Sequence, residues 1–308
     1  MKNSSIGVDI GGTIIKYGLI DTSGKLIWAS NKPTNAKTSK KKVINNILEI
    51  IRDCIGIADS LKLNILSIGV GSPGLINNNN VILGGAENIK DWNNIPLGEI
   101  IFNRFGILTK VCNDADAMAM GEYELSFKDN ETNIYITLGT GIGGAIFING
   151  NLFQGHNGLG GELGVIPIII GNQHYYWEDL ASTTGLVKLY KSKLGITDLS
   201  LEINGKYIAN EYNKGNIIAL ETVNIFTEYI AMGLAGYVNI FNPKRIIIGG
   251  GITESNIDFL EKIRTHIKKY AIKECLEGVE IVLATLGNNA GLIGAALNSL
   301  KYTETKKT

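Results

Sequence analysis

The chain has 308 residues, of which 44% are hydrophobic, and its 29 basic and 29 acidic side chains give a formal net charge of zero. This length predicts about two domains, and the balanced charge argues against nucleic acid or an anionic membrane as a partner, because both attract an excess of positive charge. The three cysteines, Cys54, Cys112 and Cys275, are widely spaced. We expect them to be buried thiols in a reducing cytoplasm. The sequence shows no signal peptide and no run of about 18–20 apolar residues, which also favours a cytoplasmic location.

The first third of the chain predicts strands with two helices among them. "SIGVDIGG" predicts a strand that ends at a glycine turn, and "IIKYGLIDTSGKLIWAS" continues as hairpin strands that turn at Ser23-Gly24. Apolar residues at helical spacing predict a helix over 42–61. "LSIGVGSPG" and "ILTKVCND" predict two short strands, and the second of these leads into a helix rich in Ala and Met.

The remainder begins with a strand pair and then becomes mostly helical. "NIYITLGTGIGGAIFING" predicts a strand, a glycine turn and a second strand. The strands "RIIIGG" and "EIVLAT" lie among helices expected at about 178–194, 216–241, 255–273 and 289–300. We expect the tail "KYTETKKT" to be disordered.

Two glycine turns share one design. Residues 7–20 and 137–150 each contain an apolar strand, a Gly/Thr turn and a second β-rich run, which suggests two related domains that face each other across a cleft. Each turn offers backbone N–H groups and a hydroxyl, from Thr13 or Thr140, to phosphate oxygens. Asp9, at the end of the first strand, could hold Mg²⁺ through water. The alternative is that both segments are ordinary hairpins.

The glycine turns do not fit the common nucleotide-binding motifs. "GTGIGG" approximates G-x-G-x-x-G, but the dinucleotide-binding fingerprint needs a helix directly after the glycines, and the residues that follow, "AIFING", are strand-like. The sequence contains no G-x-x-x-x-G-K-[ST] loop either, which excludes a Walker-type phosphate site.

Six motifs occur in order: "VDIGGTIIKYG", "GVGSPG", "NDADAMAMGE", "LGTGIGGAIFING", "GLGGELG" and "RIIIGGGI". Together they resemble the ROK family of sugar kinases, within the actin-like/hexokinase ATPase superfamily, over residues from about 5 to 298. The resemblance implies an α/β, two-domain actin-like ATPase (ribonuclease H-like) fold with an interdomain cleft. We expect an N-terminal α/β domain over 1–113, a C-terminal α/β domain over 114–289, and a helix at about 290–300 that packs back on the first domain.

The resemblance also implies a reaction. Mg²⁺·ATP would phosphorylate the 6-hydroxyl of a hexose or hexose derivative, and the protein would be a homodimer. Asp114 is then the catalytic base, because phosphoryl transfer needs a carboxylate to receive the proton of the substrate hydroxyl. Asn113 is then a sugar ligand, although Asn is also a favoured helix N-cap, and the two roles are compatible.

A non-catalytic sugar sensor with the same fold is the alternative. ROK repressors carry an additional N-terminal DNA-binding domain, and Asp9 lies too close to the start of the sequence for one to precede it. An intact Asp114 and two phosphate loops favour the kinase, since a sensor has no need of a base.

Further site residues follow from the same resemblance. Asn88 stands four residues before Trp92, as in the family's Asn-Leu-x-x-Trp pattern but with Ile89 in place of Leu; a simple turn residue is the alternative. Glu178 matches a sugar ligand, and a charge at a helix start is its alternative. The implied sugar ligands also include Gly74 and Glu162. The implied ATP ligands are Asp9, Gly11, Gly12, Thr13, Lys16, Gly139, Thr140, Gly141, Gly143, Gly250 and Gly251, and "GNNAG" at 287–291 lies on the adenosine side.

One segment departs from the family. Most ROK proteins follow the Glu-x-Gly motif with His and then a cysteine-rich zinc loop, whereas here Val165 replaces the His and "IPIIIGNQHYYWED" replaces the loop. We predict no structural zinc, because a tetrahedral site needs four Cys or His ligands. We expect apolar packing instead, with one or more of the aromatic residues buried beneath the sugar site and alternating isoleucines forming a short strand. The aromatic residues are Tyr175, Tyr176 and Trp177. The alternating isoleucines are Ile166, Ile168 and Ile170.

The departure leaves the sugar open. Replacing the His with Val165 removes a hydrogen bond to the sugar. Zinc-less relatives include N-acetylmannosamine kinases and β-glucoside kinases, so glucose, N-acetylmannosamine and a β-glucoside all remain possible substrates.

Overall fold

The computed structural model describes residues 1–196, 202–254 and 257–305. The chain forms two compact units. Unit 1 comprises residues 1–129, 154–160 and the C-terminal part from 285, and unit 2 comprises 130–153 and 161–284. Unit 1 therefore includes the helix that starts at Asp114 and the segment 154–160. The sequence-based division after residue 113 assigns both to the second domain.

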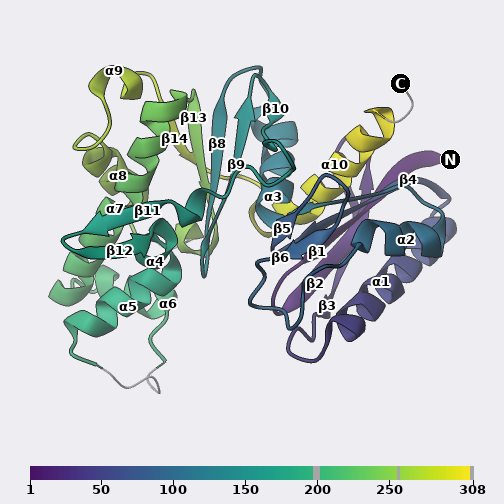
Figure 1. Cartoon of the computed structure of the whole chain (residues 1–308), viewed down its shortest axis with the longest axis horizontal. Coiled ribbons are helices and arrows are strands. Elements are labelled where there is room, and N and C mark those ends of the chain that lie inside the picture. Colours follow the sequence, from purple (N-terminus) through teal and green to yellow (C-terminus); the bar gives the residue numbers. More distant parts are fainter. Residues whose placement is uncertain (197–201, 255–256, 306–308) are drawn as a thin grey trace. The chain divides into compact units, whose positions relative to one another are not determined.

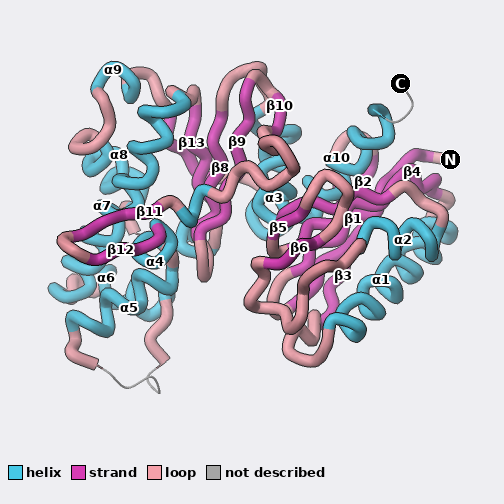
Figure 2. Tube along the Cα trace, in the orientation of Figure 1, coloured by secondary structure: helices cyan, strands magenta, loops and turns pink. Residues whose placement is uncertain are grey.

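The two units repeat one sheet topology, and the repeat agrees with the two similar hairpins in the sequence. In the described part of the chain each unit has a five-stranded sheet, with order β3-β2-β1-β4-β7 in unit 1 and β10-β9-β8-β13-β14 in unit 2 (Figures 1 and 2). In both, the central strand pairs antiparallel with the next strand of the chain and parallel with a later one. The strands are β1 (Lys2–Ile10), β2 (Ile14–Asp21), β3 (Leu26–Pro33), β4 (Leu63–Ser72), β7 (Thr109–Asn113), β8 (Asn133–Leu138), β9 (Ile142–Ile148), β10 (Asn151–Leu152), β13 (Arg245–Gly249) and β14 (Glu280–Leu283).

The helices of unit 1 cover its sheet with apolar faces. Helix α1 starts where Ser39 accepts a hydrogen bond from the Lys42 N–H, and it buries the isoleucine stripe that its spacing predicts. The final helix extends through the residues expected to be disordered up to Thr305; residues 306–308 lie outside the described part. The elements are α1 (Lys40–Ser60), β5 (Leu75–Ile76), β6 (Ile82–Gly84), α2 (Leu97–Phe105), α3 (Asp114–Glu122), the π-helical turn η1 (Tyr123–Phe127), η4 (Gly287–Asn289) and α10 (Ala290–Thr305).

The helices of unit 2 differ from the sequence-based expectation at several points. Of the helix expected at about 255–273, the described part of the chain has α8 over Phe259–Ile267. The helix predicted over 178–194 is divided at Ser182, whose backbone is extended and whose hydroxyl caps the second piece by accepting from the Gly185 N–H. A helix over Gly205–Asn213 was not predicted. The elements are η2 (Leu163–Val165), β11 (Pro167–Ile170), β12 (Gln173–Tyr176), α4 (Trp177–Ala181), α5 (Thr183–Lys193), α6 (Gly205–Asn213), α7 (Ile217–Phe241), η3 (Gly251–Glu254), α8 (Phe259–Ile267) and α9 (Lys273–Leu276).

Helix α7 is long and apolar enough to cross a membrane by length and composition alone, although the sequence reading found no such run. Half of its most apolar window is buried within the protein. Its buried residues, among them Phe226, Ile230 and Leu234, belong to the core cluster of unit 2. This arrangement is that of a core helix in a globular unit.

The segment that replaces the zinc loop forms the hairpin β11–β12, and its packing matches the prediction only in part. Ile166 and Ile168 pack against the core of unit 2, but Ile170 does not: it is exposed, because the last residues of β11 extend away from the core. Trp177 is fully buried and donates its indole N–H to the Tyr229 carbonyl oxygen at 2.8 Å. Tyr176 remains half exposed. Apolar packing therefore anchors the base of this hairpin and leaves its tip in solvent.

Helix α10 packs closely against its neighbours through four glycines, called the glycine bed below: Gly7, Gly69, Gly121 and Gly294. A Cβ atom at Gly7 of β1 or Gly69 of β4 would overlap a carbonyl oxygen of α10, and one at Gly294 would overlap the Ala117 carbonyl oxygen of α3. A Cβ at Gly121 of α3 would stand 2.5 Å from the Ala290 carbonyl oxygen. The missing side chains therefore let the backbone of α10 approach both the sheet and α3 directly.

A buried hydroxyl cluster fixes the rotation of this helix. The hydroxyls of Ser5, Ser67 and Ser299 lie 2.8–2.9 Å from one another. They come from β1, β4 and α10, so each satisfies the others in a region closed to solvent.

We predict that Gly294→Ala destabilises the protein by about 1–3 kcal/mol, because the new methyl group meets backbone that cannot rotate away. The matched control is Gly56→Ala inside α1, where a Cβ meets nothing within 4 Å. Alanine is the better helix former, so that variant should be stabilised by up to about 1 kcal/mol. Urea unfolding of both variants measures the difference, and equal stabilities would contradict the close approach.

Candidate active site

Asp114 and Asn113 stand where β7 passes into α3. The Asn113 side chain is the N-cap: its Oδ1 accepts from the Ala115 N–H at 2.8 Å, and its Nδ2 donates to the Gly74 carbonyl oxygen at 3.0 Å. Asp114 is the first helical residue, and its Oδ1 also accepts from the Ala115 N–H, at 2.9 Å. Its side chain remains accessible to solvent. Capping and an available carboxylate therefore coexist at adjacent positions.

Asp9 and Lys16 face each other across the β1–β2 hairpin. The two residues are register partners, and the Lys16 ammonium lies 3.9 Å from the Asp9 carboxylate. Lys16 also donates to the Asn288 carbonyl oxygen at 2.7 Å. A Cβ at Gly291, in the first turn of α10, would lie 3.0 Å from the Asp9 carboxylate. Residues 288–291 thus lie against the Asp9–Lys16 pair of the first hairpin.

The two carboxylates have raised pKa values. Burial raises the pKa of Asp9 to about 6; the positive charge of Lys16 lowers it, and the negative charge of Asp114 raises it. Although the Asp114 side chain is exposed to solvent, desolvation by the protein around it raises its pKa above the ordinary range, and hydrogen bonds from backbone N–H groups act in the opposite direction. Titratable groups with such shifts are typical of functional sites.

Thr34 holds the glycine turn after Asp9 through two hydrogen bonds. The Thr34 hydroxyl donates to the Gly11 carbonyl oxygen at 2.6 Å, and the Thr34 N–H donates to the Thr13 carbonyl oxygen at 2.9 Å. A Cβ at Gly12 would stand 3.0 Å from the Nδ2 atom of Asn88. The structure therefore brings the predicted sugar ligand Asn88 against the predicted phosphate turn.

Neighbouring residues fix the segment that carries Asn88. Trp92 is buried and donates its indole N–H to the Ser72 hydroxyl at 3.0 Å. Gly74 has φ +99°, and a Cβ there would stand 2.5 Å from the Gly84 carbonyl oxygen. Glycine is therefore required at the position whose carbonyl accepts from Asn113.

Unit 2 carries the second glycine turn, and three groups hold it. The Glu178 carboxylate accepts from the Ile142 N–H at 3.1 Å. The Thr184 hydroxyl donates to the Thr140 carbonyl oxygen at 2.7 Å, and the Thr183 N–H donates to the Gly139 carbonyl oxygen at 2.8 Å. Residues at the starts of α4 and α5 thus hold the turn by hydrogen bonds. Glu178 contacts it through one carboxylate oxygen.

The other predicted residues of unit 2 lie in different settings. Glu162 is exposed and precedes the 3₁₀ turn η2, and Val165 at the end of that turn is 42% exposed. Gly143 lies inside β9, paired with Thr137, and not in the turn itself. Gly250 has φ +106°, and a Cβ there would overlap the backbone of Leu138. No group of three or more His, Cys, Asp or Glu that could hold a metal occurs among the described residues.

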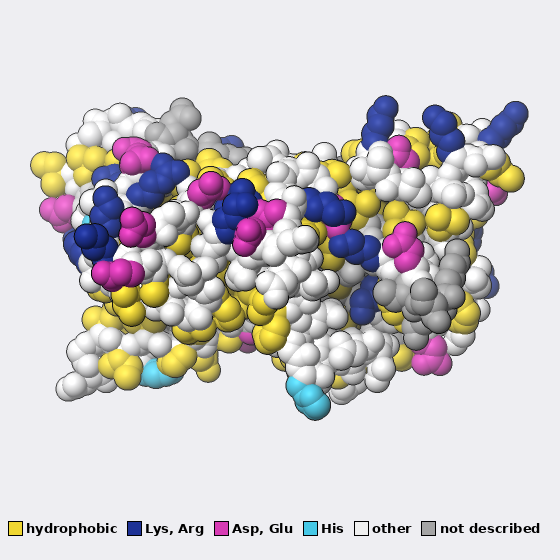
Figure 3. Space-filling model, turned by 90° about the horizontal axis from the view of Figure 1, so that it is seen from above, with side chains coloured by type: hydrophobic (Ala, Val, Ile, Leu, Met, Phe, Trp, Pro, Cys, Tyr) yellow, Lys and Arg dark blue, Asp and Glu magenta, His cyan; other side chains and the backbone are white. Residues whose placement is uncertain are grey.

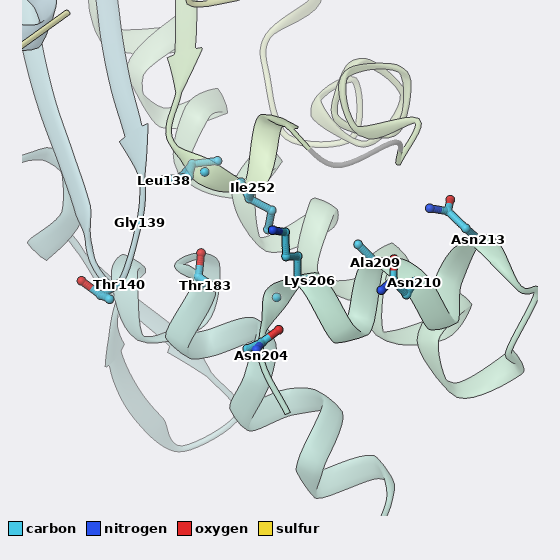
Figure 4. Close-up of a pocket in the computed structure, with 12 residues that line it drawn as sticks. Leu138, Gly139, Thr140, Thr183, Asn204, Lys206, Ala209, Asn210, Asn213 and Ile252 are labelled. Atoms are coloured by element: carbon cyan, nitrogen blue, oxygen red, sulfur yellow. The ribbon is translucent and has the colours of Figure 1, made fainter. Parts of the chain in front are cut away.

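A cavity of about 520 Å³ opens beside the second glycine turn, at Gly139 and Thr140 (Figure 4). Its wall combines apolar side chains with several amides, two hydroxyls and the ammonium group of Lys206, whose side chain extends toward Ile252 in Figure 4. The lining residues are Leu138, Gly139, Thr140, Thr183, Asn204, Gly205, Lys206, Ala209, Asn210, Asn213, Gly251 and Ile252.

Sequence reasoning missed the contribution of α6 to this cavity, namely Asn204, Lys206, Ala209, Asn210 and Asn213. The available signal was Asn204, a favoured N-cap that accepts from the Tyr207 N–H at 2.9 Å. The helix is short, and the residues before it, 197–201, lie outside the described part.

Two glucokinases match this chain over nearly its whole length, and one of them has a solved structure. The family model described as "ROK family" matches residues 5–301. A glucokinase of Halalkalibacterium halodurans is 31% identical over 94% of this chain and 92% of its own length. The ROK family glucokinase of Streptomyces griseus, solved with glucose and AMPPNP, is 30% identical with a TM-score of 0.80, over 97% of this chain and 99% of that one.

Transcriptional regulators are also similar. The xylose repressor of Caldicellulosiruptor bescii is 28% identical over 94% of this chain but only 76% of its own length. The family match and the structural similarity together show that this chain has the actin-like ATPase fold and belongs to the ROK family.

Proposed function

We propose that this protein is an ATP-dependent sugar kinase that transfers a phosphoryl group to the 6-hydroxyl of a hexose or hexose derivative. The observation that carries the proposal is the Asp114 carboxylate, which is accessible, held by the Ala115 N–H and adjacent to an Asn whose amide is fixed by Gly74. The similarity to glucokinases supports the same reaction.

Asp114 acts as the general base. Its carboxylate accepts the proton of the 6-hydroxyl while that oxygen forms its bond to the γ-phosphorus of ATP and the bond from that phosphorus to the β-phosphate oxygen breaks, which releases ADP. The raised pKa of Asp114 suits a base that must take up a proton near neutral pH. The capping hydrogen bond fixes the carboxylate and so sets its approach to the hydroxyl.

The phosphates are bound by the groups around Asp9. Lys16 supplies a positive charge, and the 11–13 turn supplies backbone N–H groups and the Thr13 hydroxyl. One carboxylate suits Mg²⁺ that arrives with ATP, because Mg²⁺ keeps several waters and uses few protein ligands. Asp9 is therefore the residue that would hold this ion through water. The ion would neutralise charge that develops on the phosphates during transfer.

Unit 2 supplies the groups that we assign to the nucleoside. The cavity beside α6 has the size of a small-molecule site and a mixed apolar and amide wall. In our proposal the Gly139–Gly141 turn with Thr140 binds phosphate oxygens, and Gly250 and Gly251 line the adenosine side. Gly143, which lies within β9, would act by keeping the strand close to its neighbours.

For the sugar, we propose Asn88, Asn113, Glu162 and Glu178 as hydroxyl ligands, with Gly74 shaping the segment beside them. Val165 takes no part in hydrogen bonding through its side chain, so glucose, N-acetylmannosamine and a β-glucoside remain the candidate substrates. On the family resemblance we also propose a cytoplasmic homodimer. Acidic and basic side chains are mixed over much of the face in Figure 3, which agrees with small-molecule partners.

A non-catalytic sugar sensor is the second candidate, and the similarity to a xylose repressor supports it. Sensing needs only a sugar site. A sensor would have no use for the Asp114 carboxylate as a base or for the Asp9–Lys16 pair beside the glycine turn, which favours the kinase.

The test of the function is an ADP-release assay over glucose, fructose, mannose, N-acetylglucosamine, N-acetylmannosamine and cellobiose. We expect sugar-dependent ADP release with at least one of them. Sugar-dependent thermal stabilisation without ADP release from any of them would identify a sensor instead.

For the active sugar, Asp114→Asn should lower kcat by at least about 10²-fold, since the amide cannot take the proton. Sugar binding should change little, because Asn keeps the shape and the oxygen that accepts from Ala115. Steady-state kinetic assays measure the change in kcat, and calorimetric titration measures sugar binding. A variant that keeps half of its activity would remove Asp114 from the role of base.

Asp9→Asn should stabilise the fold at neutral pH while it removes activity. The pKa of Asp9 is raised from 3.8 to about 6, so the ionised form is the less stable one in the folded protein. Its destabilising effect is complete above about pH 6 and disappears as pH falls toward 3.8. The gain should be at most about 3 kcal/mol. Melting curves of both proteins at pH 8 and pH 4 test this, and a gain equal at both values would contradict it.

A further inference from the structure

Glu122, the last residue of α3, is a fully buried carboxylate that binds a loop. Each of its two oxygens lies 2.9 Å from the Thr285 N–H nitrogen, and one oxygen accepts from the Leu286 N–H at 2.7 Å. The Thr285 hydroxyl donates to the other oxygen, Oε2, at 2.9 Å. One side chain therefore accepts from the N–H groups of two consecutive residues and from the hydroxyl of the first.

Burying a carboxylate costs free energy unless hydrogen bonds or a positive charge compensate for the lost water. Among the described residues no Lys or Arg forms an ion pair with Glu122; its compensation comes from Thr285 and Leu286. Within the described part of the chain the N–H groups of Thr285 and Leu286 donate to no other acceptor, so the carboxylate and the loop segment determine each other's positions.

The segment fixed in this way, residues 285–289, ends at the phosphate-binding groups of unit 1. Three residues after Thr285, the carbonyl oxygen of Asn288 accepts from the Lys16 ammonium at 2.7 Å. That ammonium lies 3.9 Å from the Asp9 carboxylate. A continuous series of contacts thus runs from Glu122 through the loop to the cation of the site.

We propose that Glu122 is a positioning residue for nucleotide binding: by holding residues 285–289 it presents the Asn288 carbonyl oxygen to Lys16 and keeps the ammonium beside Asp9. This rests on the proposed function, in which Lys16 and Asp9 receive the phosphates and the magnesium ion. Glu122 touches neither substrate; it acts through the orientation of Lys16.

The role is separable from holding the fold together. Helix α10, which follows the loop, is fixed independently by the glycine bed and by the buried hydroxyls of Ser5, Ser67 and Ser299. Loss of the Glu122 contacts should therefore free the loop without releasing the helix.

The experiment measures the dissociation constants of Mg²⁺·AMPPNP and of the active sugar by calorimetry. In Glu122→Gln an amide NH₂ replaces one acceptor oxygen and meets a backbone N–H, so the loop must shift. We expect nucleotide binding to weaken by about tenfold or more, the size expected when a buried charged acceptor is lost. Sugar binding should stay within about twofold of the wild type.

The matched control is Glu124→Gln. Glu124 lies half a turn further along, pairs with Lys128 and Lys301, and makes no described contact to the loop. It should bind nucleotide as the wild type does. Thr285→Val is a milder second variant, since it removes only the hydroxyl donor. Because that hydroxyl also lies 2.6 Å from the Ser126 hydroxyl, Ser126→Ala accounts for that contact.

A double-mutant cycle with Lys16→Met shows whether Glu122 acts through Lys16. If it does, Glu122→Gln and Thr285→Val should weaken nucleotide binding in the wild-type background and have little further effect once Lys16 is Met. Effects that multiply in the double variants would overturn the proposal, as would equal weakening of sugar binding or unchanged nucleotide binding. Should Glu122→Gln fail to fold, Thr285→Val decides the question alone.

The same proteins are assayed for phosphoryl transfer. A wild type that binds nucleotide but transfers no phosphoryl group would refute the kinase and leave the binding comparison to decide the role of Glu122. A kinase whose nucleotide affinity is unaffected by Glu122→Gln would refute only the positioning role.

Discussion

The close backbone contact of α10 with β1, β4 and α3 is the constraint on which unit 1 depends. Glycines at these contacts let carbonyl oxygens of one element touch the Cα atoms of another, a distance that no side chain permits. The contact brings the residues from Thr285 onward to the end of β1. Without it, Asp9 would not meet the first turn of α10, and Lys16 would lose its acceptor at Asn288. The architecture of the sheet and the geometry of the site thus have a common origin.

Much of the fold was predictable because its signals are local. The apolar spacing over 42–61 and the two similar hairpins at 7–20 and 137–150 predicted α1 and the repeated strand pairs, and the structure confirms both. The errors have physical causes. Ser182 divides a predicted helix because its hydroxyl caps the next one, and the polar tail through Thr305 is helical because α10, already anchored, extends the helix at little cost.

The candidate site divides in the same way. Asp114, Asn113, Asp9 and the glycine turns could be found from motifs, because each motif is a short run whose backbone shape is coded locally. The contacts that orient them could not. Lys16 meets Asn288 across 272 positions, and Glu122 meets Thr285 across 163. Such partners share no sequence pattern, so only the folded chain shows that one carboxylate holds a loop and that the loop in turn holds a cation.

The site also shows where the fold gives up stability. The pKa values of Asp9 and Asp114 are both raised. The folded protein would be more stable with a neutral residue in place of Asp9. A carboxylate desolvated in this way interacts more strongly with a phosphate-bound cation than a solvated one does, because less water competes for it. The glycine bed and the buried serine cluster supply rigid support nearby, so the destabilised carboxylate stays in place instead of relaxing into water. Rigidity at α10 and electrostatic strain at Asp9 are therefore complementary: the rigid support lets the strained carboxylate persist at the end of the sheet to which we assign phosphate binding.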